Sequence, residues 1–323
     1  MREGEPKFDA DGQNEEKRTS GVYKIVGFGK EEEQFIKEDF ADLFEDQDFE
    51  EWEREKTPEE KEIINRIILR LPEFIKQFGG TPLALTQDHV HIIDEQKLPE
   101  KYRGEMSLRA GGYNTTDQHV EVYPIDIYGK SNKLHFAHTV VHELMHFLAF
   151  QSIQKHPKKE LMTERRSGFS VRKNGGTEFY FDKVDEALIE TAAIKFEDKY
   201  FSEIPQLAEE LQKREMIKDL IVKDGNPKAA EMTAYINEID GTNHAIPYSL
   251  EGDIRELRHL IKETYNSNKD YVASEEAVEQ IYLQSLFTGK LLEIARMTKR
   301  LGRGDKTLFR RIGELTKRDR KVG

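Results

Sequence analysis

Apolar residues recur at helical spacing after residue 57 and predict the first well-marked helix. Thr57, Pro58 and Glu60 supply an N-cap, a proline at the first helical position and a capping-box glutamate. The apolar stripe needs a sheet or a second helix to cover it, and Gly79 and Gly80 end the helix. The stripe consists of Ile63, Ile64, Ile67, Ile68, Leu71, Phe74, Ile75 and Phe78.

Short β-like runs come next. Three of them span residues 83–94, 106–113 and 119–123. The third alternates His, Val, Glu, Val and Tyr, which suits a strand with one solvated face, such as the edge of a sheet. The preceding Gly-Gly-Tyr-Asn at 111–114 is interpreted as a turn into that edge strand.

Two further helices are predicted in the middle of the chain. Residues 133–154 form a strongly apolar pattern, and residues 184–200 follow a predicted β-hairpin. After Pro205 the pattern is helical nearly throughout, with breaks at 225–227 and 241–247.

These elements predict an α+β fold with three parts. Residues 1–56 form an acidic, partly disordered leader, residues 57–202 combine a small mixed sheet with helices, and residues 203–323 form a mainly helical C-terminal subdomain with a basic tail. Acidic side chains outnumber basic ones by sixteen to four over 31–62, whereas basic ones lead by eleven to three over 296–323. The opposite charges suggest, as a hypothesis, that the leader lies across the basic region or the active-site cleft and controls access.

Composition narrows the possible functions. The 323 residues contain no cysteine, which excludes disulfides, thiolate metal sites and cysteine nucleophiles, so a metal would need His and carboxylate ligands. The net charge of −12 argues against nucleic-acid binding, for which the basic tail at 296–321 is the only sign. We expect a cytoplasmic protein without membrane contact, because no stretch approaches the roughly 20 apolar residues of a membrane span and the first residues lack a secretory signal.

The central motif is an HExxH pentapeptide at residues 142–146. Residues four apart share one face of a helix, so His142 and His146 can reach one metal ion while Glu143 is displaced toward the open coordination position. The flanking residues are uncharged, as in a buried helix that crosses beneath a cleft.

A second predicted helix, forty residues beyond His146, carries Glu186 and Glu190 on one face. Glu186 can complete a site of two histidines and one glutamate. Glu190 can accept the remaining ring N–H of a liganding histidine, which fixes the tautomer and the orientation of the imidazole. An ordinary solvated acidic face is the alternative interpretation of this helix.

With these residues, the stretch 119–200 resembles the gluzincins, the thermolysin-like zinc metallopeptidases. Their third-ligand helix typically reads Asn-Glu-x-x-x-Asp/Glu, and here Asp185 and Glu186 are followed by Glu190. The chain departs from the family in having Asp185 for asparagine and in a longer gap between the two helices than thermolysin has. The metzincin pattern does not fit, because it needs glycine and histidine where Ala149 and Ser152 stand.

The resemblance implies a zincin-like catalytic domain over residues 57–202, one Zn²⁺ per chain and a peptide or protein substrate. His142, His146 and Glu186 would bind the metal, and Glu143 would act as general base toward a metal-activated water. The Gly-x-Met-Glu-Asn run of gluzincin aminopeptidases is missing, which favours an endopeptidase.

Other roles stay open. The family usually supplies an oxyanion donor as a Tyr or His downstream of the third ligand, and Tyr248 and His244 are the candidates. His138 shares the helical face of His142 and is interpreted as a core histidine or one that supports the ligands, rather than as an extra ligand. The alternative function is a catalytically silent zincin-fold module that binds or regulates a partner, acting through the basic tail.

Overall fold

The structure is a computed structural model of the chain. It describes residues 22, 24–26, 52–98, 110–114, 119–123, 132–155, 162–172, 179–239, 241–302 and 308–315. Most of the predicted acidic leader and the end of the basic tail lie outside the described residues. The hypothesis that the leader controls access concerns that part of the chain and also lies outside the described residues.

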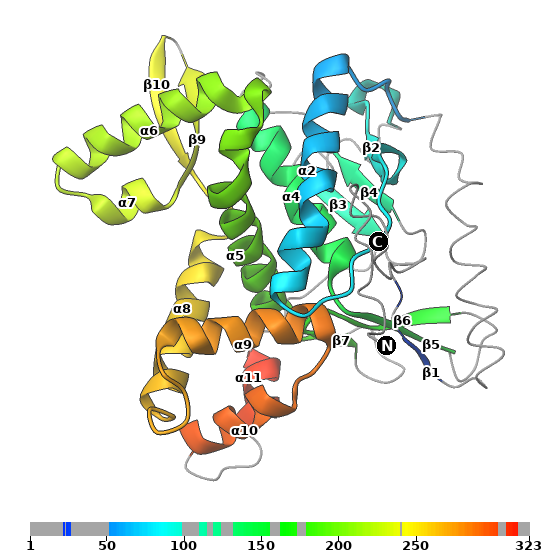
Figure 1. The fold of residues 1–323 in the computed structure, drawn as a ribbon, viewed down its shortest axis with the longest axis vertical. Coiled ribbons are helices and arrows are strands. Elements are labelled where there is room, and N and C mark those ends of the chain that lie inside the picture. Colours follow the sequence, from blue (N-terminus) through cyan, green and yellow to red (C-terminus); the bar gives the residue numbers. More distant parts are fainter. Residues whose placement is uncertain are drawn as a thin grey trace, which may run out of the picture.

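Helices and small sheets combine in an α+β fold, which confirms the predicted fold class at that level (Figure 1). The helices are α2 (Pro58–Gln77), α4 (Lys133–Leu148), α5 (Asp182–Tyr200), α6 (Ala208–Lys223), α7 (Pro227–Glu231), α8 (Glu251–Asn266), α9 (Glu275–Thr288), α10 (Leu292–Leu301) and α11 (Leu308–Leu315). The strands are β1 (Lys24–Val26), β2 (Val90–Ile92), β3 (Gly111–Asn114), β4 (His119–Val122), β5 (Gln151–Lys155), β6 (Met162–Ser167), β7 (Ser170–Arg172), β8 (Phe179–Tyr180), β9 (Thr233–Ile239) and β10 (Thr242–Pro247).

The described strands form three sheets. The first has the order β1-β5-β6-β7-β8, with β1 parallel to β5 and the other pairs antiparallel. The second has the order β2-β4-β3, with β2 parallel and β3 antiparallel to β4, so it is the small mixed sheet that was predicted. The third is the antiparallel hairpin of β9 and β10.

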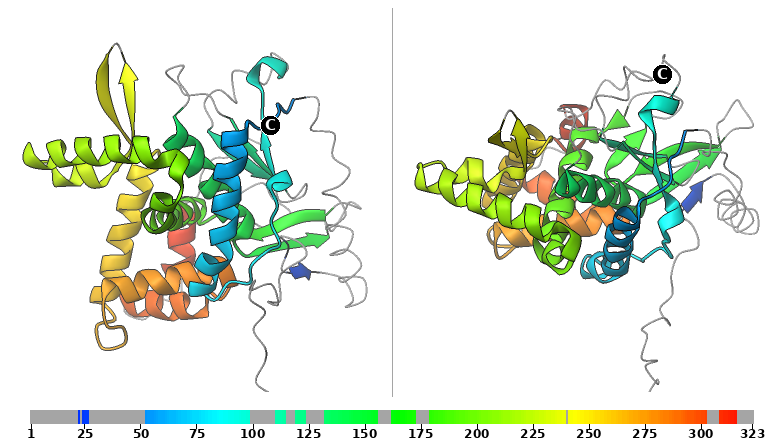
Figure 2. Two further views of the ribbon diagram at one scale, coloured as in Figure 1. Left: turned by 45° about the horizontal axis from the view of Figure 1, so that its top comes forward. Right: turned by 90° about the horizontal axis from the view of Figure 1, so that it is seen from above.

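Helices α4 and α5 lie side by side at the centre of the molecule, and α2 packs on α4. Helices α8 to α11 gather near one end of α5, whereas α6, α7 and the β9–β10 hairpin project near its other end (Figures 1 and 2). Each of the described helices is too short or too polar to traverse a lipid bilayer.

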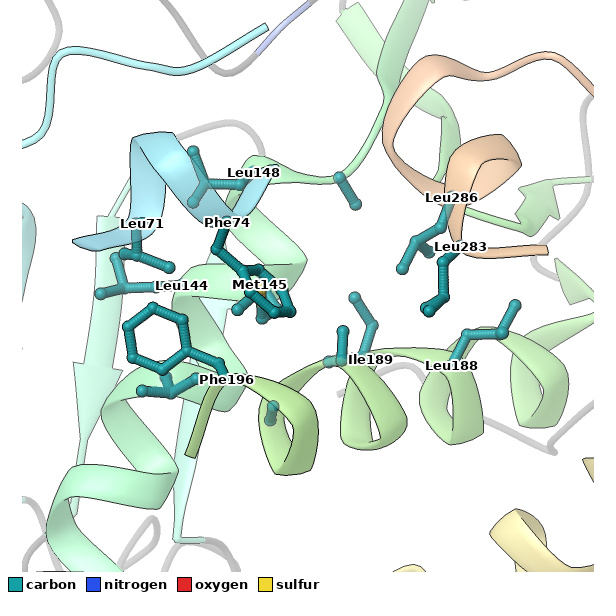
Figure 3. Packing of buried hydrophobic residues seen from close by; sticks show 14 of the residues in the cluster. Leu71, Phe74, Leu144, Met145, Leu148, Leu188, Ile189, Phe196, Leu283 and Leu286 are labelled. Atoms are coloured by element: carbon teal, nitrogen blue, oxygen red, sulfur yellow. The ribbon is translucent and has the colours of Figure 1, made fainter. Parts of the chain in front are cut away.

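The apolar face of α4 forms part of the main core. Side chains of α2, α4, α5 and α9 point toward one another there (Figure 3). The same hydrophobic cluster continues from Ile63 to Met297, on both sides of the predicted boundary between residues 202 and 203. A fully buried aliphatic or aromatic side chain contributes about 1.5–3 kcal/mol, so this core fixes how α4 and α5 face each other. Labelled members are Leu71, Phe74, Leu144, Met145, Leu148, Leu188, Ile189, Phe196, Leu283 and Leu286.

The predicted helix over 133–154 ends earlier, at Leu148. Ala149 is extended, with φ −60° and ψ 164°, and β5 begins at Gln151. The side-chain amide of Gln151 donates to the carbonyls of His146 and Phe147, at 3.3 and 3.1 Å, and so satisfies the end of the helix. Apolar character alone did not distinguish the buried strand β5 from a continued helix.

Two predictions about the mixed sheet are wrong. Residues 119–123 were expected at an edge, but β4 lies between β2 and β3. Residues 111–114 were expected to be a turn, but they form β3, paired with β4 in the register Gly111↔Val122 to Asn114↔His119. Paired glycines are weak strand formers, and the close approach of α4 explains the glycine at 111.

The region after Pro205 is less helical than predicted, because residues 233–247 form the β9–β10 hairpin. Gly241, with φ 75°, allows the reversal between the two strands. The residues of β9 are buried from Thr233 to Asn237, whereas those of β10 are mostly exposed. Because consecutive residues of β9 are buried, the strand lacks the alternation of apolar and polar residues that would have predicted it.

Helix predictions near the start and near the end of the described chain are confirmed. The capping box of α2 is present: the Glu60 N–H donates to Thr57 Oγ1 at 3.2 Å, and the Thr57 N–H donates to Glu60 Oε2 at 2.8 Å. Within the basic tail, α10 and α11 form as predicted, and Phe309 of α11 packs on Phe181, with ring centroids 4.8 Å apart.

The end of the acidic leader is attached to β2. The Arg54 N–H donates to the Ile92 carbonyl at 2.9 Å, and Glu53 Oε2 lies 2.9 Å from His91 Nδ1. Lys56 Nζ donates to Glu53 Oε1, also at 2.9 Å. Burial raises the pKa of Glu53, but the bonds from His91 and Lys56 outweigh it and lower that pKa to about 2.

We therefore expect Glu53→Gln to lower the free energy of unfolding near pH 7 and to lose this effect in acid. The folded pKa is about 2 against a usual 4.5, so the contribution of the Glu53 charge is complete above pH 4.5 and is lost as the pH falls through about 2. Urea unfolding from about pH 7 to about pH 3 measures it. Glu55→Gln changes an exposed neighbour and serves as control. A Glu53→Gln difference that stays constant over this range would contradict the assignment.

Candidate metal centre

Three histidines of α4, spaced by four residues, face carboxylates on one side of α5. His146 Nε2 lies 3.5 Å from Glu186 Oε2, and at the other end His138 Nδ1 lies 3.2 Å from Glu197 Oε2. The two helices therefore run antiparallel with matched polar faces. The histidines are His138, His142 and His146, and the facing carboxylates are Asp185, Glu186, Glu190 and Glu197.

His142 and His146 share one face of α4, as the HExxH spacing predicts, and Glu186 of α5 lies opposite them. Glu186 Oε2 is 3.8 Å from His142 Nε2 and 3.5 Å from His146 Nε2, and ligand atoms of the three lie within 4.8 Å of one another. Two ligands each about 2.0–2.1 Å from a tetrahedral zinc ion lie roughly 3.4 Å apart, so the two distances from Glu186 need only a small contraction. Two imidazoles and one carboxylate also suit zinc chemically, so the donor set fits the expected metal.

The other ring nitrogen of each of these histidines faces a carboxylate. His142 Nδ1 lies 2.7 Å from Glu190 Oε2, and His146 Nδ1 lies 3.9 Å from Asp185 Oδ2, beyond hydrogen-bond distance. An ionised carboxylate accepts a hydrogen bond from a nitrogen that carries a proton. The bond from Nδ1 to Glu190 therefore orients the ring of His142 with Nε2 toward Glu186. Glu190 thus lies where the sequence analysis expects it.

Asp185 is a residue whose role the sequence analysis misses. It is held by the Phe169 N–H, which donates to Asp185 Oδ1 at 2.6 Å. The turn before Phe169 needs glycine: Gly168 has φ +52°, and a Cβ there would lie 2.2 Å from Asp185 Oδ1. Burial raises the pKa of Asp185 to about 7, against the lowering effect of His146 and of the Phe169 N–H. The only sequence signal was its place where gluzincins have asparagine.

Glu143 lies beside the metal-ligand group under β3, and its side chain is buried. A Cβ on Gly111 of β3 would lie 2.8 Å from Glu143 Cγ and 2.8 Å from Thr139 Cγ2. Glycine at 111 therefore lets the strand backbone approach Glu143 closely. Burial raises the pKa of Glu143, whereas His142 and His146 lower it.

Tyr113, also on β3, covers the last histidine of the motif. Its ring stacks on His146 with centroids 5.5 Å apart and planes 3° from parallel. Its hydroxyl shares a 2.9 Å hydrogen bond with Ser167 Oγ. Tyr113 was not predicted as a site residue, because residues 111–114 were interpreted as a turn.

Opposing effects set the electrostatics of the group. Burial lowers the pKa of His142, but Glu186 and Glu190 outweigh it and hold that pKa well above its usual range. Burial raises the pKa of Glu186, but His146 and His142 outweigh it and hold that pKa well below its usual range. Charged imidazoles and carboxylates thus stabilise each other in the interior.

A second group of possible metal ligands shares His142 with the first. His138, His142 and Glu190 also bring ligand atoms within 4.8 Å of one another. His138 Nε2 lies 3.2 Å and 3.3 Å from the two oxygens of Glu190. Burial lowers the pKa of His138, but Glu190 and Glu197 outweigh it and raise that pKa to about 9.

The two candidate oxyanion donors lie in different surroundings. Tyr248 is buried, its hydroxyl donates to Glu197 Oε1 at 3.3 Å, and its ring lies 5.1 Å from that of His138. His244 is exposed on β10, opposite Asn237 in the hairpin. The structure thus places Tyr248 next to the histidine face, and neither residue belongs to the described metal-ligand groups.

A cavity of about 670 Å³ lies apart from this centre. It is lined by residues of α6, α7, the hairpin and α8, among them Ile221, Met232, Pro247 and Ile254. None of the metal-ligand residues lines it. The centre is instead bounded by α4, α5 and β3.

Comparison with known proteins does not identify a family. No family model, curated protein or solved structure matches this chain. The resemblance to gluzincins therefore depends on the residues of α4 and α5, and the functional argument depends on their geometry.

Two neighbouring glycines of β3 give a matched test of the contact with Glu143. We expect Gly111→Ala to lower the free energy of unfolding by about 1–3 kcal/mol, because the new methyl group overlaps Glu143 and Thr139. Gly112→Ala should change it by less than about 0.5 kcal/mol, because the nearest atom to its Cβ, Glu121 Oε2, is 3.9 Å away. Urea unfolding of both variants measures the difference. Equal effects would contradict the close packing of β3 on α4.

Proposed function

We propose that this chain is a zinc-dependent endopeptidase of the gluzincin type, with a zincin-like catalytic region formed by α4, α5 and β3. The observation that carries the proposal is the convergence of His142, His146 and Glu186 beside Glu143. Each histidine has a carboxylate facing its other ring nitrogen, an arrangement typical of protein metal sites.

His142, His146 and Glu186 would hold the ion. When bound, zinc supplies a Lewis acid that polarises a carbonyl group and lowers the pKa of a water toward about 7. Glu190 orients the ring of His142, and Asp185, itself held by the Phe169 N–H, faces His146. The hydrogen bond to Glu190 fixes the ring of His142 before the metal arrives, which favours tight binding.

Glu143 acts as general base in this proposal. It takes a proton from the attacking water and returns it to the leaving amine, a transfer that typically contributes about 10²–10⁴-fold to the rate. The backbone of β3 closes over its side chain at Gly111, so Glu143 has little freedom to leave the site. Its position next to His142 in the helix keeps it adjacent to the ligands.

An extended peptide is the substrate that suits this arrangement. β3 is one of the two outer strands of the described mixed sheet and is antiparallel to β4, so a peptide backbone can pair along its other side. Such main-chain pairing depends little on sequence and carries the peptide past Glu143.

The first test is the zinc content and the activity of the full chain and of its Glu143→Gln variant. We expect one zinc per chain in both proteins. Cleavage of casein should require the metal and should fall by about 10²–10⁴-fold in the variant. Zinc in both proteins with cleavage by neither would favour the silent binding module instead.

A second pair of variants tests the ligands. His146→Gln should abolish stoichiometric zinc binding, because it removes one of three protein ligands. His135→Gln is the matched control: it lies on the same helix, packs on Tyr235 with centroids 4.8 Å apart, and belongs to neither ligand group. Zinc retained by His146→Gln, or absent from the unchanged chain, would overturn the proposed function.

A further inference from the structure

Both ring nitrogens of His138 face carboxylates. Nδ1 lies 3.2 Å from Glu197 Oε2, and Nε2 lies 3.2 Å from Glu190 Oε1. An ionised carboxylate only accepts hydrogen bonds, so a nitrogen that bonds to one must carry a proton. The geometry therefore selects the imidazolium form of His138, with both nitrogens as donors.

The two carboxylates that face His138 are buried. The side chains of Glu190 and Glu197 are 1% and 2% exposed, and a buried carboxylate without a cationic partner is costly. Glu197 has a second cation, because Arg214 of α6 donates to its Oε1. His138 is the cation that the two carboxylates share.

A continuous path of contacts thus leaves the metal-ligand group. His142 Nδ1 contacts Glu190 at 2.7 Å, Glu190 contacts His138, and His138 contacts Glu197. Arg214 extends the path, because its Nη1 also donates to the carbonyl of Ala234 in β9, at 3.2 Å. The path therefore extends from His142 to the α6 and β9 part of the fold.

We propose that His138 is a positioning residue of the metal centre, which holds the Glu190 carboxylate in place to accept the hydrogen bond of His142 Nδ1. Without His138, Glu190 keeps only His142 as a cationic or donor partner among the contacts described above, and its carboxylate can turn away. The ring of His142 then loses its fixed orientation and binds metal less tightly. The inference rests on the proposed function, because it takes His142 as a metal ligand.

Two other roles for His138 predict different measurements. As a second metal ligand with His142 and Glu190, it would raise the metal content to two ions per chain. As an ordinary core histidine, it would affect metal binding only through general stability, and independently of Glu190. A double-mutant cycle separates these possibilities from the proposed role.

The experiment measures the zinc dissociation constant of the full chain by competition with a chromophoric chelator. Four proteins are compared: the unchanged chain, His138→Gln, Glu190→Gln and the double variant. We expect Glu190→Gln to weaken zinc binding by about 10–100-fold and His138→Gln by about tenfold. In the Glu190→Gln background, His138→Gln should change the constant by less than about twofold, since its effect passes through Glu190.

Each outcome decides the proposal. An equal loss from His138→Gln in both backgrounds overturns it in favour of a structural histidine, and two zinc ions in the unchanged chain but one in His138→Gln overturn it in favour of a second site. Absence of zinc from the unchanged chain overturns both this inference and the proposed function, whereas bound zinc without cleavage affects only the latter. If His138→Gln does not fold, Glu197→Gln replaces it in the cycle, and its loss of zinc affinity should likewise disappear in the Glu190→Gln background.

Discussion

The pairing of imidazoles with carboxylates between two buried antiparallel helices is the interaction on which this centre depends. Neither set of side chains is stable alone in the interior, because an unpaired charge there is costly. Paired, the histidines of α4 and the carboxylates of α5 satisfy one another over about two helical turns, from His138 to His146. Because each buried charge needs its partner, these polar faces specify one register between the two helices.

Hydrophobic packing holds that register from the other side. The side chains of Leu144, Met145 and Leu148 point from α4 toward α2 and the core. Those of Leu188 and Ile189 are buried in the same core, away from the carboxylate face of α5 (Figure 3). A slip of one turn, about 5.4 Å, would break the apolar packing and mispair the charges at the same time. The core and the candidate site therefore stabilise the same arrangement.

Elements from two different sheets complete the surroundings of the two helices. From the five-stranded sheet, the turn at Gly168 places the Phe169 N–H on Asp185. From the mixed sheet, Gly111 and Tyr113 of β3 lie against Glu143 and His146. Glycine occurs at both places where the backbone of a sheet approaches a side chain of the candidate site, because a Cβ at Gly111 or Gly168 would overlap that side chain.

The sequence by itself determined the local part of this protein: the capping box at Thr57, the helical face shared by His142 and His146, and the helical face shared by Glu186 and Glu190. These features depend on spacing along one helix, which the chain fixes within a few residues. Tertiary structure alone decided that β5 follows α4, that β4 lies inside the mixed sheet with β3 at one edge, and that Asp185, Tyr113 and the path from His138 to Arg214 belong to the centre. Those choices join residues far apart in the chain, and periodicity along the sequence carries no information about which distant partner completes a buried polar group.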